Sequence, residues 1–298
     1  MHGHDERNTT RQRRTMRWGV VCPAPLARDE RRRPSRAEQV RQTAVMELVE
    51  ELQRAGLRLR ELTLDRDGRP VTGVLWQPAA HVAGAPLVCL GHGASGDRHQ
   101  QPIPWLAERL VGRHGWSALA IDGPVHGRRQ VGAGGREAFW PEWQREGSVE
   151  DMTADWRFAL DAVQALPEVG TGPVAYWGLS MGTIYGALFV AAEPRVRAAV
   201  LGLMGITGPD HYRPRVQQAA KAITCPLLFL VQLEDELFSR QDCLALFDAF
   251  ASGDKRLHAN PGLHPDVPTE ELHASIEFLV RAVSGPDGER RSAVAVSS

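Results

Sequence analysis

Short, uniformly apolar runs alternate with amphipathic segments through most of the chain from residue 86 onward. The apolar runs lie at residues 87–90, 117–121, 174–177, 198–203 and 227–231, with a weaker run at 256–259. The segments with helical spacing lie at about 104–112, 149–166, from 181 onward, 241–251 and 270–283. Because a strand without polar alternation is buried on both faces, this order predicts an α/β fold with a mainly parallel central sheet and helices on both faces.

The periodicity changes before residue 86. Residues 57–64 alternate between apolar and polar, Asp67-Gly68 is a turn signal, and residues 71–76 continue as extended chain, which together predict an N-terminal antiparallel hairpin. The apolar residues upstream of the hairpin are Val40, Ala44, Leu48, Val49 and Leu52. Their spacing predicts a helix over residues 37–54.

Charge divides the chain into a basic head and a globular remainder. Residues 1–36 hold ten arginines and four acidic residues, a net +6 in a chain whose total is −1. This head lacks apolar periodicity, so we expect a disordered Arg-rich extension at residues 1–36, a single α/β domain at 37–284 and a flexible tail at 285–298. A basic head can also contact nucleic acid, but its arginines are not interleaved with aromatics, and we expect no nucleic-acid partner.

Localisation is inferred from the apolar runs and the cysteines. No run reaches the length of about eighteen apolar residues that a membrane span needs, so we expect no membrane association. Arg13-Arg14 is followed by too short an apolar stretch, interrupted by Pro23 and Pro25, to act as an export signal. The four cysteines are Cys22, Cys89, Cys225 and Cys243. Their wide spacing predicts free thiols in a reducing compartment, and hence a cytoplasmic protein.

Gly178-Leu179-Ser180-Met181-Gly182 matches the pattern G-x-S-x-G and stands between a predicted strand and a predicted helix. A serine on such a sharp turn projects its hydroxyl above the sheet, and the flanking residues must be glycine to avoid the neighbouring backbone. The motif therefore predicts Ser180 as a nucleophile.

With this motif in this context, residues 57–283 resemble the α/β-hydrolase superfamily, particularly its dienelactone-hydrolase-like and small serine esterase members. The resemblance implies a Ser-Asp-His triad in that chain order. Residues 232–238 resemble the family's G-x-x-D-x-x-V loop and so imply Asp235 as the acid, with Gln232 where a glycine is usual. Glu234 and Glu236 are the neighbours that could be mistaken for the acid.

Residues 260–265 resemble the family's P-G-x-H loop, which implies His264 as the base, held in the correct tautomer by Asp235. The oxyanion hole is then expected at the amide of Met181 and an amide of residues 91–96, which resemble the family's H-G-x segment. Ala94 is the first candidate there and Ser95 the second. His92 would brace this loop, and residues 122–127 resemble an architectural D-x-P-G-H-G segment.

Two connections bear on specificity. The segment between residues 128 and 149 contains Phe139, Trp140 and Trp143, which we expect to form an apolar wall of the substrate pocket, although they would equally suit packing of a surface loop. The second connection, at residues 204–224, is also short. Because both connections are short, we expect a small cap domain or none. The pocket would then suit small or medium acyl substrates.

The sequence therefore predicts a serine hydrolase that cleaves a small or medium carboxylic ester through an acyl-enzyme. A thioesterase, lactonase or amidase would use the same triad, and a non-catalytic binding module on the same scaffold is the alternative from another class. No metal-ligand spacing or nucleotide-binding motif is present, so no metal and no cofactor are expected. The natural substrate, stereochemical preference and oligomeric state are left open.

Overall fold

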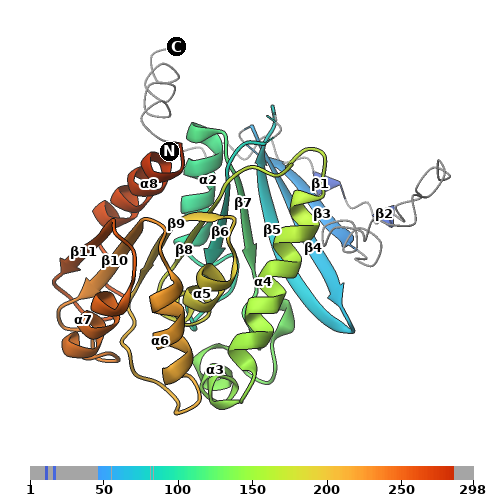
Figure 1. The fold of residues 1–298 in the computed structure, drawn as a ribbon. Coiled ribbons are helices and arrows are strands. Elements are labelled where there is room, and N and C mark those ends of the chain that lie inside the picture. Colours follow the sequence, from blue (N-terminus) through green and yellow to red (C-terminus); the bar gives the residue numbers. More distant parts are fainter. Residues whose placement is uncertain are drawn as a thin grey trace, which may run out of the picture.

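In the part of the chain that the structure describes, a central β-sheet of eleven strands has helices on both sides (Figure 1). The computed structural model describes residues 11–12, 16–17, 46–54, 56–80, 82 and 84–284. The strands are β1 (Arg11–Gln12), β2 (Met16–Arg17), β3 (Met46–Arg54), β4 (Leu57–Arg66), β5 (Arg69–Pro78), β6 (Leu87–Gly91), β7 (Ser117–Ile121), β8 (Val174–Gly178), β9 (Val196–Gly202), β10 (Leu227–Gln232) and β11 (Lys255–Asn260).

The sheet has a parallel and an antiparallel part. Its order is β1-β3-β4-β5-β7-β6-β8-β9-β10-β11, with β2 also paired to β3. All pairs from β7 to β11 are parallel, whereas β3, β4 and β5 are antiparallel and β5 joins β7 in the antiparallel sense. The predicted parallel sheet and hairpin are thus confirmed. Gly91 pairs with Gly178 at the ends of β6 and β8, so the chain leaves both strands at the same edge.

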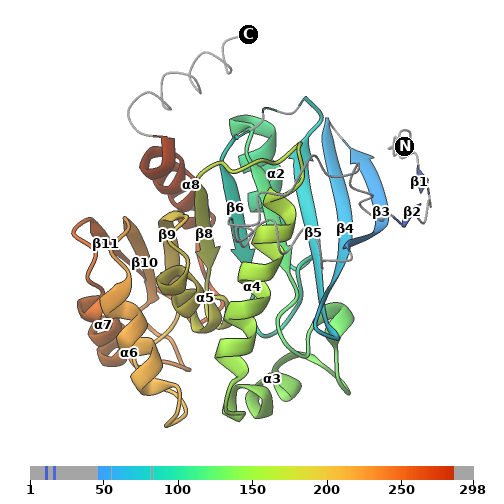
Figure 2. The ribbon, with the colours of Figure 1, turned by 45° about the vertical axis from the view of Figure 1, so that its right-hand side comes forward.

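Helices cover each face of the sheet (Figure 2). They are α2 (Ile103–His114), η1 (Gly127–Arg129), α3 (Gly135–Gln144), α4 (Ser148–Gln164), α5 (Met181–Ala192), α6 (Arg213–Ala222), α7 (Arg240–Ala249) and α8 (Thr269–Ser284). The helices α4 to α7 pack on one face and α2 with α8 on the other, so the sheet separates two hydrophobic clusters. No helix of this described part is both long and apolar enough to cross a bilayer.

The helix predicted at residues 37–54 is wrong over Met46–Arg54. That segment is β3, antiparallel to β4, with Leu52 opposite Leu59. The apolar and charged residues of this segment fit the period of a helix as well as that of a strand. The edge of β4 offers backbone hydrogen bonds to a neighbouring strand, which a local sequence pattern does not reveal. Residues 37–45 lie outside the described residues, as does the tail at 285–298. Of the predicted extension at 1–36, only β1 and β2 are described, and its disorder stays a prediction.

Two helices lie where the sequence predicted irregular connections. The glycines and Pro141 argued against a helix at α3, yet Phe139 and Trp143 stand one turn apart there and are 2% and 3% exposed. Burial of this aromatic face stabilises a helix that propensity alone disfavours. The helix α6 begins with Pro214 in its first turn, where the missing N–H is harmless.

Candidate active site

Ser180 occupies a strained turn between β8 and α5. Its backbone has φ 56° and ψ −119°, a conformation that L-residues seldom adopt. A Cβ on Gly178 would lie 2.9 Å from the carbonyl oxygen of Gly182, and a Cβ on Gly182 only 2.6 Å from that of Gly91. Backbone atoms of this turn and of the end of β6 therefore leave no room for a side chain at either glycine. This is the steric reason that the motif predicted for both.

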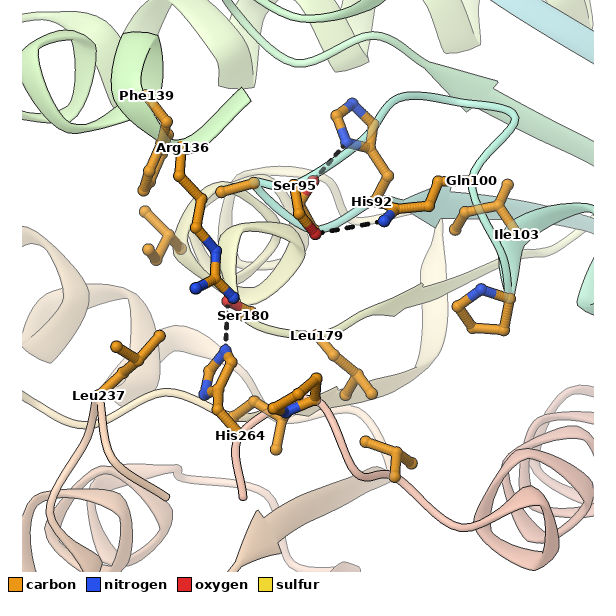
Figure 3. A pocket seen from close by; sticks show the side chains of 18 of the residues that line it. His92, Ser95, Gln100, Ile103, Arg136, Phe139, Leu179, Ser180, Leu237 and His264 are labelled. Atoms are coloured by element: carbon orange, nitrogen blue, oxygen red, sulfur yellow. Dashed lines mark hydrogen bonds between the residues drawn. The ribbon is translucent and has the colours of Figure 1, made fainter. Parts of the chain in front are cut away.

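Ser180, His264 and Asp235 form one hydrogen-bonded chain. The Oγ of Ser180 lies 2.8 Å from Nε2 of His264 (Figure 3), and Nδ1 of His264 lies 2.8 Å from Oδ2 of Asp235. The side chains of His264 and Asp235 are 4% and 2% exposed. An Nδ1–H that donates to the carboxylate leaves the Nε2 lone pair free to accept the serine proton, which is the tautomer a general base requires.

Asp235 is held as an anion by three hydrogen bonds. Its Oδ1 accepts hydrogen bonds from the amides of Leu237 (2.8 Å) and Phe238 (3.0 Å), while Oδ2 faces the imidazole. Burial alone would raise the pKa of this carboxyl, but the hydrogen bonds from His264, Phe238 and Leu237 outweigh it and keep the pKa below its ordinary value. The carboxylate can therefore stabilise a positive imidazolium.

The neighbouring acidic residues and Gln232 hold the segment that carries His264. Glu236 accepts the backbone N–H of His264 (2.8 Å), and Glu234 accepts that of Gly262. Gln232, 1% exposed at the end of β10, aims its Nε2 at three carbonyl oxygens of the same segment, at 2.8 to 3.4 Å. Gln232 departs from the glycine usual in the resembled motif, and here its amide fixes the histidine loop.

The two amides expected to form the oxyanion hole belong to the residue after Ser180 and to the loop after β6. Met181 is the first residue of α5, so its N–H has no acceptor within the helix. On the loop after β6, Nδ1 of His92 lies 2.8 Å from the carbonyl oxygen of Gly93, and Nε2 of His92 accepts the amide of Gly123 at 2.8 Å. Since a trans peptide directs C=O and N–H in opposite senses, His92 fixes the direction of the Ala94 amide.

Burial sets the protonation state of His92. This imidazole is 3% exposed, and burial, with repulsion from His126, lowers its pKa to about 4. It is therefore neutral at pH 7 and acts as a brace, in keeping with the prediction from the sequence. The segment at residues 122–127 is also a bracing element, because the buried Asp122 accepts hydrogen bonds from Thr72, Arg98 and the Arg128 amide.

A cavity of about 320 Å³ opens above Ser180. Ser180 and His264 lie at its base, with the loop after β6, the helix α3 and the segments after β10 and β11 around it (Figure 3). Phe139 and Trp140 line this cavity, as the sequence led us to expect, and Ala94 and Ser95 belong to the same lining. The volume matches small-molecule sites.

Trp143 lies outside that lining. Its ring stacks on Phe139 with centroids 5.8 Å apart and contacts the edge of Tyr212 at 5.3 Å. Positions 139 and 143 face the core of the domain on α3, whereas Trp140 is turned outward and is 42% exposed. Trp143 thus supports the wall from behind, a distinction that the sequence could not make without the helix.

Among the lining residues that the sequence did not predict, Arg136, Gln100 and Gln101 are the ones with charged or amide side chains. Arg136 precedes Phe139 and Trp140 by three and four residues, so a helix at α3 would have placed all three on adjoining positions of one surface. Among the described side chains, no group of three or more His, Cys, Asp or Glu is arranged to hold a metal ion.

Comparisons with known proteins yielded structural relatives only. No protein-family model matches the chain, and no curated protein does. A cold-adapted esterase from an Arctic intertidal metagenomic library matches with a TM-score of 0.71 and 39% identity, over 78% of this chain and 97% of that one. The acetyl xylan esterase from Paenibacillus sp. R4 matches with a TM-score of 0.62 and 21% identity, over 80% and 88% of the two chains. The 2,6-dihydroxy-pseudo-oxynicotine hydrolase matches at 0.58 and 15%, over 75% and 67%.

Proposed function

The chain belongs to the esterases of the α/β-hydrolase superfamily, and we propose that it hydrolyses esters of small or medium carboxylic acids through an acyl-enzyme on Ser180. The observation that carries this proposal is the hydrogen-bonded series Asp235–His264–Ser180, which ends at the base of an open cavity. The esterase at 39% identity supports ester hydrolysis.

The first half of the reaction transfers the acyl group to the serine. As Oγ of Ser180 attacks the carbonyl carbon, Nε2 of His264 takes the hydroxyl proton and Asp235 stabilises the imidazolium. The charge that develops on the carbonyl oxygen meets the N–H groups of Met181 and Ala94. Collapse of this tetrahedral species breaks the bond to the alcohol oxygen, which receives the proton from Nε2.

The second half returns the enzyme to its starting state. A water molecule replaces the departed alcohol, gives a proton to Nε2 of His264 and attacks the acyl carbon. The same amides hold the second oxyanion. Release of the carboxylic acid restores the Ser180 hydroxyl with the proton from Nε2, so that proton and acyl group are both accounted for.

The dimensions of the cavity support the proposed size of the substrate. At about 320 Å³ it stands at the lower end of the range for small-molecule sites. Thioesters, lactones and amides present the same carbonyl to the same residues, and we rank them behind esters because the 39% identical relative is an esterase. We also propose a reducing, cytoplasmic setting, supported by free thiols at Cys89, Cys225 and Cys243.

Labelling by a fluorophosphonate probe tests the activated serine. We expect wild-type protein to react, and Ser180→Ala and His264→Ala to lose the reaction. Ser95→Ala is the matched control, because Ser95 is a second serine lining the same cavity but lies outside the hydrogen-bonded series. A folded wild-type protein that neither reacts with the probe nor hydrolyses short 4-nitrophenyl esters would favour the non-catalytic binding module instead.

A further inference from the structure

Arg136 is a solvent-exposed residue that lines the cavity. It is the second residue of α3, and its side chain extends from that helix into the space lined by Ser180 and His264 (Figure 3). No described residue forms a hydrogen bond or ion pair with it. Some other arginines of the described part do form ion pairs, as Arg98 does with Asp122 and Arg129 with Asp155.

Arg136 stands out among the residues that line the cavity by its charge. Among the described residues that line it there is no aspartate, glutamate or lysine, and Arg136 is the one arginine. Of the two lining histidines, His92 is neutral at pH 7 because burial lowers its pKa to about 4. Apart from His264, which is hydrogen-bonded to the carboxylate of Asp235, the guanidinium is therefore the charged group of this described lining. Arg136 is itself solvent-exposed and stands beside the apolar residues Phe139 and Trp140.

The position of Arg136 is unfavourable for the helix itself. A cation in the first turn of a helix opposes the macrodipole, whose positive end lies there. No ion pair of the described residues holds Arg136 in place and the helix dipole disfavours it there, whereas an anion in the cavity would be attracted by the guanidinium.

We propose that Arg136 determines specificity by binding an anionic group, a carboxylate or another small oxyanion, carried by the ester substrate. This inference rests on the proposed function and deepens it. The planar fork of a guanidinium donates two parallel hydrogen bonds to a carboxylate, which orients the substrate as well as attracting it. The preferred esters are then half-esters of dicarboxylic acids, or esters of alcohols that bear a carboxylate.

Matched ester pairs test the proposal. On the acyl side, 4-nitrophenyl hemiglutarate is compared with 4-nitrophenyl pentanoate, and on the alcohol side, 3-carboxyphenyl butyrate with phenyl butyrate. In at least one pair we expect the ratio of kcat/KM, anionic over neutral, to fall about tenfold in Arg136→Gln, through KM. Arg136→Lys should retain part of the preference, and Arg136→Glu should lose more of it.

A substitution that disturbs Ser180 lowers kcat/KM for both esters of a pair. The ratio of the two kcat/KM values therefore reports only the effect of the charge on the ester. Arg113→Gln is the control, since it removes an equal charge from the last turn of α2. Its ratios should equal those of wild type. If neutral esters are hydrolysed and neither ratio depends on Arg136, the inference is overturned while the proposed function stands.

A binding measurement covers the case in which no ester is hydrolysed. Trp140 and Trp177 line the cavity and report its occupancy by fluorescence. Titration with glutarate should change the emission of wild-type protein, and this change should be lost in Arg136→Gln but not in Arg113→Gln. Equal responses of wild type and Arg136→Gln would reject the anion site, whatever the catalytic outcome.

Discussion

His92 contributes to the proposed reaction by orienting a peptide group, not by touching the substrate. His92→Ala removes the hydrogen bond to the Gly93 carbonyl, so the Ala94 amide loses its fixed direction. We expect kcat for a short 4-nitrophenyl ester to fall about tenfold or more, with a smaller change in KM, since a lost oxyanion donor costs about 10²- to 10³-fold. His99→Ala, on the same loop and paired with Glu61, should leave kcat near the wild-type value.

The depressed pKa of His92 also makes stability depend on pH. The unfolded chain binds a proton on this imidazole below its ordinary value of 6.5, whereas the folded protein does so only near pH 4. The contribution of His92 to the unfolding free energy is therefore complete above pH 6.5 and is lost as the pH falls toward 4. Urea unfolding of wild type and His92→Gln between pH 4 and 8 measures this, and parallel curves would contradict it.

Asp235 also makes the unfolding free energy depend on pH, because its carboxylate is stabilised in the folded protein. Its pKa in the folded protein lies below the ordinary value of 3.8. The stability it contributes is present above that value and is lost only as the pH falls through the depressed pKa.

Asp235→Asn should lower kcat by roughly 10³- to 10⁴-fold at pH 7, because the amide favours the wrong tautomer of His264. A kcat within tenfold of wild type would show that another group orients His264.

At the scale of the element, Gln232 connects the end of β10 to the loop that carries His264. Gln232→Gly, which restores the residue usual in the resembled motif, removes three contacts to carbonyl oxygens of that loop. We expect kcat/KM to fall about tenfold and amide hydrogen exchange at residues 260–266 to accelerate. Unchanged exchange together with unchanged kcat/KM would mean that Glu234 and Glu236 suffice to hold the loop.

Elements whose sequence pattern fits only one kind of secondary structure were predictable. Elements whose local signals conflict, or whose structure depends on a distant partner, were not. The uniformly apolar strands β6 to β10 have a single reading, because only a doubly covered sheet buries every side chain. At α3, glycines and Pro141 contradict the helix that buried aromatics stabilise. At β3, the partner strand decides the structure, and nothing local identifies it.

The same contrast applies to the site. Ser180 and His264 stand at turns with recognisable neighbours, so a motif sufficed to bring them together. The identity of a lining side chain depends on which way a helix is turned, and this separates Trp140 from Trp143 although both are tryptophans of one segment. Arg136 escaped notice for the same reason, since its segment was expected to be irregular.

At the scale of the whole molecule, Asp155 joins distant segments. Its carboxylate is fully buried on α4 and pairs with Arg66, Arg69 and Arg129, from β4, β5 and η1. Asp155→Asn removes the carboxylate that pairs with Arg129 and leaves Arg66 and Arg69 only their longer contacts to Asp151, at 3.8 Å. We expect a loss of about 3 kcal/mol in unfolding free energy. Urea unfolding should show a much smaller loss for Asp151→Asn, whose side chain is 37% exposed. Equal losses would contradict this role.

The acyl-enzyme on Ser180 is the central claim, and its direct test is to trap it. Wild-type protein mixed with 4-nitrophenyl acetate and quenched in acid within the first turnover should gain the mass of one acetyl group, and peptide mapping should locate that group on Ser180. Release of 4-nitrophenol should begin with a burst equal to the enzyme concentration, absent from Ser180→Ala. Turnover by wild type without an acylated species, or an acetyl group on another residue whose removal abolishes turnover, would contradict the account.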